Sequence, residues 1–376
     1  MAKIFHCADL HLDSPFTSLT AEKSRILRQS VLTAFSKAVD RAASDGCDLM
    51  LIAGDLFDSD FVTAKTLETV CAKLSSHPEL SVAISPGNHD PYGKSSFWSQ
   101  AKLPPNVHLF TEDRLTSFSI TSLDGERIEV YGYAFTSPAM ERCPMAVTRP
   151  SDPGVINIVC AHADIYDPLR KKYAYIPPAE IAKTGYDYVA LGHIHTATVP
   201  EKAGGTWYAY SGSLCGRGWD ECGEKGALEI GITKDGSGTN LTCQAVPISE
   251  YRFEALDCDC QGADTPGDIT SAADKIASAV PDPGHILLRL TLRGQISPSC
   301  EPDIERIRER FSSCFAIEVE DKTQPIYDSA RLSEDPTVRG AFFRALYPSL
   351  CSADENERKK AAEALRYGLA ALNGEL

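Results

Sequence analysis

Mostly apolar runs alternate with longer helix-like segments at the start of the chain. The apolar runs lie at 3–8, 49–53 and 80–84, and their length is typical of strands that are buried on both faces of a parallel sheet. The segments between them, 25–44 and 64–74, carry apolar residues near helical spacing. This order of strand, helix, strand, helix and strand predicts a parallel sheet with helices on its faces.

From residue 107 onward the pattern changes to shorter strand-like pieces without long helices between them. The expected strands in this part span 127–135, 155–160, 188–191, 206–210, 227–232 and 241–247. The sheet system therefore becomes mixed. We expect an α/β (α+β) fold in which two mixed β-sheets stack and helices flank them.

The composition shifts near Tyr251, and the stretch 257–268 that follows is loop-like and rich in Gly and Asp. Beyond it, two helix patterns alternate with two strand patterns, which predicts a small α+β unit. The pattern then turns helical up to the end of the sequence. We therefore expect three parts, at residues 1–250, 251–327 and 328–376.

Composition narrows the classes of protein to which the chain can belong. It has 376 residues, of which 43% are hydrophobic, enough for a sizeable core. Its formal net charge of −15 argues against a broad basic surface that holds DNA unaided, although bound metal ions could supply a positive field. No apolar run approaches the ~18 residues of a membrane helix, and the 13 cysteines include no Cys-x-x-Cys pair. We expect a reduced, cytoplasmic protein that has no membrane partner.

Polar side chains that can bind metal ions follow five of the expected strands. They are Asp9 and His11, Asp55, Asn88 with His89 and Asp90, His162, and His193 with His195. Because ligands bind at the carboxyl ends of strands in an open α/β sheet, we expect these five segments to converge on one place. Each fragment alone is equally typical of a capped turn, so it is their repetition at strand ends that favours a site.

The residue types fit the coordination of transition metals. Asp9 and His11 are two residues apart, so their side chains point the same way in extended backbone, and so do those of His193 and His195. Two carboxylates, several imidazoles and an amide oxygen form a mixed N/O set, which suits Mn, Fe, Zn or Ni better than Ca or Mg. Seven ligands are too many for one tetrahedral ion but suit two ions that share a carboxylate, the usual arrangement for hydrolysing phosphate esters.

Five short motifs occur in a fixed order: Asp9-x-His11, Gly54-Asp55, Gly87-Asn88-His89-Asp90, His162 and Gly192-His193-x-His195. Together they resemble the motifs of the calcineurin-like metallophosphoesterases. The stretches HCADLHLDSPF and AGDLFD further resemble the SbcD-type DNA repair nucleases, and within them the YhaO-like branch. The loop YSGSLCGRGWDECGEKG is similar to the Tyr-Ser-Gly-Ser loop of that family, which an acidic residue and Lys-Gly follow. The resemblance is strong over residues 3–235 and only architectural beyond them.

The resemblance implies a role for each of these residues. Three ligand groups follow from it: Asp9, His11 and His195 for one metal ion; Asn88, His162 and His193 for a second; and Asp55 as the bridge. His89 would be catalytic, either stabilising the transition state or protonating the leaving oxygen. The implied cofactors are two divalent transition-metal ions, with Mn²⁺ as the first expectation and Fe, Zn or Ni as alternatives.

One position departs from the pattern of the family. Several DNA-cutting relatives carry a histidine three residues after the bridging aspartate, where this chain has Asp58. Asp58 could accept a hydrogen bond from a residue of the site or be an ordinary loop acid. The difference bears on exonuclease efficiency and not on the metal site. Asp90 is expected to orient its neighbours rather than to bind metal.

The resemblance further implies a phosphodiesterase that cuts DNA as an exonuclease or endonuclease in DNA repair, with an SbcC-like coiled-coil ATPase as partner. Residues 251–327 would form a cap over the site. The C-terminal helices would dock on the ATPase through an apolar stripe, unless that stripe packs on its own domain. The stripe consists of Val338, Ala341, Phe342, Ala345 and Leu346. Whether the protein forms a homodimer stays open.

Two other functions are compatible with the same motifs. A phosphodiesterase for small substrates such as cyclic nucleotides would need neither a cap nor a helical tail. A non-catalytic scaffold of the same fold would have no chemical reason to keep seven metal ligands. Cleavage of cyclic nucleotides in preference to DNA would support the first alternative, and purified protein without a bound transition metal would support the second.

Overall fold

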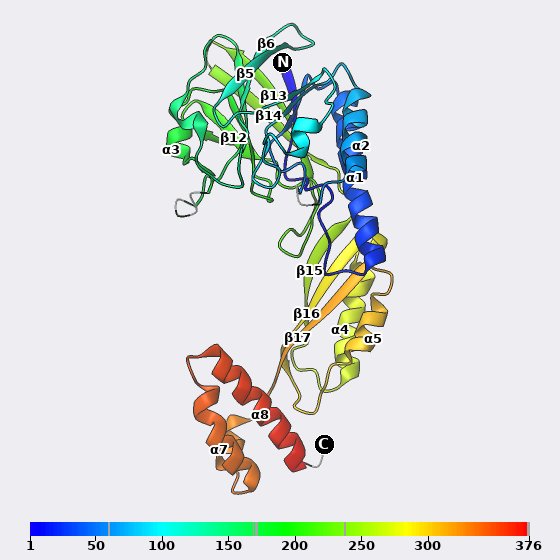
Figure 1. Ribbon diagram of the computed structural model, residues 1–376. Helices are drawn as coiled ribbons and strands as arrows, with labels where there is room; N and C mark the ends of the chain where they lie inside the picture. The colour runs from blue at the N-terminus through cyan, green and yellow to red at the C-terminus, as the bar shows by residue number, and fades with distance from the viewer. Residues whose placement is uncertain (59–60, 168, 170–171, 237, 374–376) are drawn as a thin grey trace. The chain divides into compact units, whose positions relative to one another are not determined.

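The chain folds into two compact units, Met1–Arg252 and Phe253–Leu376 (Figure 1). The computed structural model describes residues 1–58, 61–167, 169, 172–236 and 238–373. No helix within those ranges is long and apolar enough to cross a membrane.

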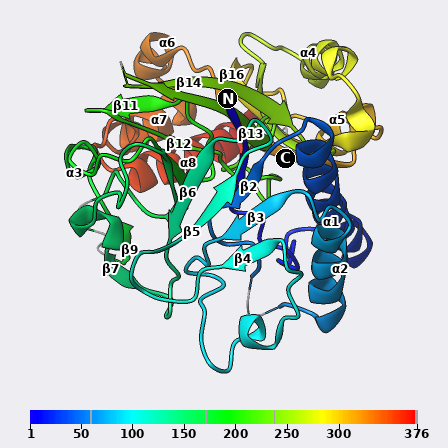
Figure 2. The same cartoon turned by 90° about the horizontal axis from the view of Figure 1, so that it is seen from above.

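The first sheet of the N-terminal unit has six strands in the order β14-β13-β1-β2-β3-β4. Four of them run parallel: β1 (Ala2–Cys7), β2 (Leu49–Ile52), β3 (Ser81–Ile84) and β4 (Val107–Leu109). The hairpin of β13 (Gly226–Asp235) and β14 (Gly238–Pro247) pairs antiparallel with β1. Helices α1 (Ala21–Ser44) and α2 (Ala64–Ser75) lie side by side next to this sheet (Figure 2). Each begins after a threonine N-cap, Thr20 and Thr63, whose hydroxyl oxygen accepts a backbone N–H.

The second sheet of this unit also has six strands, in the order β11-β12-β10-β8-β6-β5. Its parallel strands are β6 (Arg127–Gly132), β8 (Ile156–His162), β10 (Tyr188–Gly192) and β12 (Thr206–Tyr210). Antiparallel strands close both edges: β5 (Thr116–Thr121) and β11 (Glu201–Ala203). The connections carry short elements: η1 (Phe97–Gln100), β7 (Met140–Arg142), η2 (Pro144–Val147), β9 (Tyr173–Tyr175) and α3 (Pro178–Ile181).

The two sheets stack through one hydrophobic core. Alternate residues of the strands point into it, for example Ile4 of β1 and Leu51 of β2 from one sheet, and Val130 of β6 and Ile158 of β8 from the other. Each side chain of this size contributes about 1.5–3 kcal/mol when it is fully buried. The residues between them, such as Val159, face a second cluster on the outer side of the second sheet. The expected fold of two stacked mixed sheets flanked by helices is therefore confirmed.

The C-terminal unit contains a three-stranded sheet in the order β15-β16-β17. The strands are β15 (Arg252–Asp259), β16 (Ile286–Ile296) and β17 (Ala316–Pro325), and the accompanying helices are α4 (Pro266–Ala279), η3 (Pro283–His285) and α5 (Ile304–Arg310). The expectation of a loop from residue 257 is wrong for residues 257–259, which belong to β15. The error arises because side chains along a strand alternate between its two faces. Cys258 and Cys260 are buried in the core, whereas the acidic residues beside them give the stretch the composition of a loop.

The last helices form a small cluster of their own: α6 (Ser329–Glu334), α7 (Val338–Leu350) and α8 (Glu355–Asn373). Phe343 of α7 packs on Leu365 and Leu369 of α8, and Phe342 and Leu346 are partly buried against the same cluster. Part of the expected apolar stripe thus packs within the unit. Val338, at the start of α7, is 69% exposed.

Candidate metal centre

The eight predicted site residues all lie at the carboxyl ends of strands from both sheets. Asp9 and His11 follow β1, Asp55 follows β2, and Asn88 and His89 follow β3. His162 is the last residue of β8, and His193 and His195 follow β10. Because the two sheets stack, segments separated by up to 186 positions in the sequence can meet at one edge of the fold.

Distances between side-chain atoms show which of these groups are neighbours. The Asp9 carboxylate lies 3.8 Å from both His162 Nδ1 and His195 Nε2. The Asp55 carboxylate lies 3.4 Å from His162 Nε2 and 3.7 Å from His11 Nε2. Asn88 Oδ1 is 3.0 Å from His162 Nε2, and the His193 ring centroid is 5.2 Å from that of His162.

Two clusters of this kind could each hold a metal ion. The first consists of Asp9, His11 and His195, and the second of Asp9, Asp55 and His162, with ligand atoms within 4.8 Å of one another in each. Five of the seven expected ligands belong to these two clusters, which share Asp9, whereas the expected bridge is Asp55. Asn88 and His193 belong to neither cluster but lie beside His162. A third group, His11, Asp58 and His89, meets the same distance limit and lies further toward solvent.

The surroundings of these side chains fit a bound cation. Asp9, His11, Asp55 and His162 are almost completely buried, and burial raises the pKa of the Asp9 carboxyl while His162 and His195 lower it. Among the described residues, neither ring nitrogen of His11 has a hydrogen-bond partner. Burying two carboxylates and an unpartnered imidazole costs free energy that a divalent ion would offset. The donor set of carboxylate oxygen and imidazole nitrogen suits transition metals.

The backbone that carries the ligands is strained. Asp9, His11 and Asp55 have φ of 53°, 46° and 49°, and His193 has φ of 102°, in the region that non-glycine residues avoid. Each such residue costs on the order of 1–3 kcal/mol and persists only where the surrounding structure fixes it. The strain gathers in the segments that present the candidate ligands.

Close packing explains why glycine precedes the ligands. A Cβ atom at Gly54, where φ is 90°, would lie 2.2 Å from Nδ1 of His162. A Cβ atom at Gly192 would lie 1.8 Å from the carbonyl oxygen of Ala53. The two sheets therefore approach each other closely at this edge, and only glycine leaves room for the ligand of one strand against the backbone of another.

Asp90 has a structural task beneath the site. Its carboxylate accepts backbone N–H groups from Gly87 at 2.7 Å, Leu56 at 2.9 Å and Phe57 at 3.3 Å. Burial and the neighbouring Asp55 raise the pKa of Asp90 to about 7, although these N–H donors lower it. Asp90 thus ties the loop after β3 to the loop after β2.

His89 stands at the solvent side of the centre. Its side chain is 47% exposed, its ring lies 4.8 Å from the ring of His11, and its backbone N–H donates to Asp55 Oδ1 at 2.9 Å. Asp58 has Oδ1 3.6 Å from His89 Nδ1. Nδ1 is therefore the ring nitrogen of His89 that lies on the side of Asp58.

One residue of the site was missed by the sequence interpretation. Glu221 is buried, and its Oε1 is 2.7 Å from His195 Nδ1, while its Oε2 accepts from the Ser213 hydroxyl and the Arg217 backbone N–H. Burial opposes the charge of both groups, yet their contact raises the pKa of His195 and lowers that of Glu221. In the sequence it is one of three acidic residues of YSGSLCGRGWDECGEKG, with Asp220 and Glu224, and nothing there singles it out.

The same contact decides which nitrogen of His195 is available to a metal ion. Arg217 Nη2 lies 3.3 Å from Nδ1, but Arg217 can only donate, and the shorter contact to a carboxylate indicates an N–H at Nδ1. A neutral imidazole that donates from Nδ1 keeps its lone pair on Nε2. That nitrogen faces Asp9 at 3.8 Å.

Comparisons with known proteins identify the family to which the chain belongs. The sequence profile of the calcineurin-like phosphoesterases matches residues 2–197. The chain is 30% identical over 239 residues to an uncharacterized metallophosphoesterase, YhaO of Bacillus subtilis (strain 168), covering 61% of this chain and 57% of that protein. It is 25% identical over 223 residues to the DNA double-strand break repair protein Mre11 of Methanopyrus kandleri, covering 56% of this chain and 48% of that protein. The chain therefore spans about half the length of these curated relatives.

Solved structures show more distant likenesses. The protein TT1561 of Thermus thermophilus matches with a TM-score of 0.37 and 15% identity, over 60% of this chain and 93% of that one. A dimetal phosphatase from Danio rerio matches with a TM-score of 0.36 and 11% identity, over 61% and 92%. On the match over residues 2–197, the chain belongs to the calcineurin-like phosphoesterase family.

Proposed function

We propose that this metallophosphoesterase is a metal-dependent phosphodiesterase that hydrolyses DNA in repair, as an SbcD-type nuclease working with an SbcC-like coiled-coil ATPase. The observation that carries the proposal is the convergence of buried carboxylates and imidazoles at the carboxyl ends of strands from both sheets. The similarity to a protein described as a DNA double-strand break repair protein supports the choice of DNA.

Two divalent ions, with Mn²⁺ as the first choice, would occupy the centre. Asp9, His11 and His195 would hold one ion, Asn88, His162 and His193 the other, and Asp55 would bridge them. When bound, such a pair neutralises charge on the phosphate and lowers the pKa of water toward neutrality. Asp90 and Glu221 would fix the ligand geometry, the first through backbone N–H groups and the second through His195 Nδ1.

His89 would act directly on the substrate. Its ring is partly exposed at the edge of the centre, and Asp58 lies on its Nδ1 side. Nε2 would therefore face the phosphodiester and either donate a proton to the leaving oxygen or stabilise charge in the transition state. Such a group contributes typically 10²–10⁴-fold to the rate.

The C-terminal helices would supply the docking surface for the ATPase. Phe342 and Leu346 are partly buried within their own cluster, so the surface left for a partner would include the exposed side chains of Val338, Tyr347 and Tyr367. Aromatic side chains on adjacent helices suit docking against another helix. A net charge of −15 argues against a broad basic surface, so metal ions or a partner would supply the positive field that holds DNA.

The purified protein tests the proposal when it is incubated with Mn²⁺ and labelled single- or double-stranded DNA, with and without the ATPase. Cleavage is expected, and His89→Ala should reduce its rate by about 10²-fold or more without loss of bound metal. Intact DNA under all these conditions would overturn the proposal. Faster cleavage of cyclic nucleotides than of DNA would favour a small-substrate phosphodiesterase instead.

A further inference from the structure

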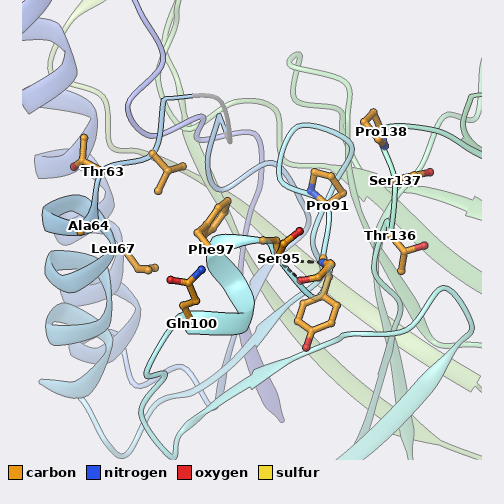
Figure 3. Close-up of a pocket in the computed structure, with 14 residues that line it drawn as sticks. Thr63, Ala64, Leu67, Pro91, Ser95, Phe97, Gln100, Thr136, Ser137 and Pro138 are labelled. Atoms are coloured by element: carbon orange, nitrogen blue, oxygen red, sulfur yellow. Dashed lines mark hydrogen bonds between the residues drawn. The ribbon is translucent and has the colours of Figure 1, made fainter.

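A cavity of about 690 Å³ opens beside the loop that carries His89 (Figure 3). One wall is the start of α2, with Ala64 and Leu67, and the opposite wall is formed by Thr136 and Ser137. The segment 91–100 lies between them and includes the 3-10 helix η1. Its volume is in the range typical of ligand pockets, roughly 300–1,000 Å³.

The cavity adjoins the candidate metal centre through two of its walls. Pro91 lines it and follows His89 by two positions, so the Cα atoms of these residues are at most about 7.6 Å apart. Thr63 also lines it, and its backbone N–H donates to Asp13 at 2.9 Å, two positions after His11. Two of the residues that line the cavity are therefore linked directly to the segments that carry His89 and His11.

The walls of the cavity are held in place by contacts of their own. Behind it, the ring of Phe57 packs on Phe97 at 5.0 Å and on Trp98 at 5.3 Å between centroids. Trp98 Nε1 donates to the Asp90 carbonyl oxygen at 2.8 Å, which fastens this segment to the loop under the metal centre. The backbone N–H of Tyr92 donates to the carbonyl oxygen of Phe135 at 2.7 Å and fixes the far wall.

The lining has a distinct chemistry from the metal centre. None of the described residues that line the cavity carries a charge, so it offers nothing to balance a phosphate or a carboxylate. It offers the rings of Tyr92 and Phe97 together with the amide of Gln100 and hydroxyls such as that of Ser95. Flat aromatic faces and neutral hydrogen-bonding groups recognise an uncharged, flat ligand with polar edges.

We propose that this cavity binds a nucleobase of the nucleotide next to the scissile phosphate. The inference rests on the proposed function, since the metal centre would hold the phosphate and the neutral cavity the base beside it. A base that enters the cavity cannot be paired at the same time. The enzyme would therefore act on an unpaired or frayed nucleotide.

Filling the cavity tests this assignment. Ala64→Trp and Ser137→Trp place a large ring into it from opposite walls, and both positions are exposed, so neither side chain is inserted into the core. Ala21→Trp is the matched control, because Ala21 is likewise the exposed first residue of a helix that follows a threonine N-cap. Midpoints of unfolding confirm that each variant is folded.

The first readout compares two chromogenic phosphodiesters in Mn²⁺: thymidine 5′-p-nitrophenyl phosphate, which has a base, and bis(p-nitrophenyl) phosphate, which has none. The ratio of their kcat/KM values is expected to fall about tenfold in both cavity variants and to stay unchanged in Ala21→Trp. An unchanged ratio in both cavity variants would overturn the assignment.

The second readout needs neither metal nor catalysis. Saturation-transfer NMR with thymidine in metal-free buffer is expected to give signals on the base protons with wild type and Ala21→Trp, and none with the cavity variants. No transfer on wild type, or equal transfer on all four proteins, would overturn the assignment. If wild type cleaves neither diester nor DNA, the proposed function fails, whereas thymidine binding still decides what the cavity holds.

Discussion

Single residues outside the metal-binding motifs determine which atom of a candidate ligand is available to a metal ion. Glu221 lies 26 positions from His195 in the sequence, yet its carboxylate fixes the proton of that imidazole on Nδ1. Arg217 balances the charge of Glu221 from 3.4 Å. Whether Nε2 of His195 is available to a metal ion therefore depends on Glu221 as well as on the histidine itself.

Replacing Glu221 by glutamine keeps the shape of this side chain but removes its charge. We expect Glu221→Gln to weaken Mn²⁺ binding by about tenfold, because the imidazole loses the group that raises its basicity. Isothermal titration calorimetry with Mn²⁺ measures the change in affinity. Glu224→Gln is the control, since Glu224 lies in the same loop and its side chain is 71% exposed. Equal affinities in wild type and Glu221→Gln would contradict this role.

His6 predicts a pH dependence of stability. Burial lowers its pKa to about 3, against ~6.5 in an unfolded chain. The unfolded state therefore takes up the proton first, so the stability due to neutral His6 is complete above about pH 6.5. It falls by up to ~1.4 kcal/mol for each pH unit below that value, down to about pH 3. His6→Gln, which can still bond to the Tyr188 hydroxyl, should flatten this fall in urea titrations. Equal slopes would show that His6 does not titrate in this way.

At the scale of elements, the carboxyl ends of β1, β2, β8 and β10 form one tightly packed edge. The left-handed backbone at Asp9 and Asp55 and the close contact at Gly54 belong to the same edge. Packing of the two sheets holds the strained ligands in place, so loosening the edge is expected to affect both stability and metal binding.

Two glycine variants separate steric contact from backbone strain. Gly54→Ala and Gly46→Ala both put a Cβ on a residue with positive φ, 90° and 68°, but only at Gly54 does the Cβ meet other atoms. We expect Gly54→Ala to lower the free energy of unfolding by about 1–3 kcal/mol more than Gly46→Ala, because it presses on the His162 ring. Urea unfolding measures both. Equal losses would mean that His162 has room to move.

The elements also show which parts of the fold and of the site can be predicted from the sequence alone. The strands β2 and β3 are predictable because short apolar runs buried on both faces have few other structures open to them. β15 is not, because only Phe253 and Cys258 are buried in it, and acidic residues flank Cys258 on both sides. The ligand motifs are local and could be recognised, whereas Glu221 and the cavity depend on contacts between segments far apart in the sequence.

At the scale of the whole molecule, an acidic chain is proposed to act on a polyanion. The net charge is −15, and Asp9 and Asp55 of the two candidate clusters are among the buried carboxylates that contribute to it. Two divalent ions would reverse the sign of the charge at the centre, where the phosphate must sit. The whole account therefore depends on whether metal ions bind at the predicted residues.

Anomalous scattering from crystals soaked in Mn²⁺ tests this claim most directly. The account predicts two peaks, about 3.5–4 Å apart, on either side of the Asp55 carboxylate, one near Asp9 and His195 and the other near Asn88 and His162. The absence of peaks at these residues would contradict it. So would a single peak held by Asp58 and His89, the other group whose spacing could accept an ion.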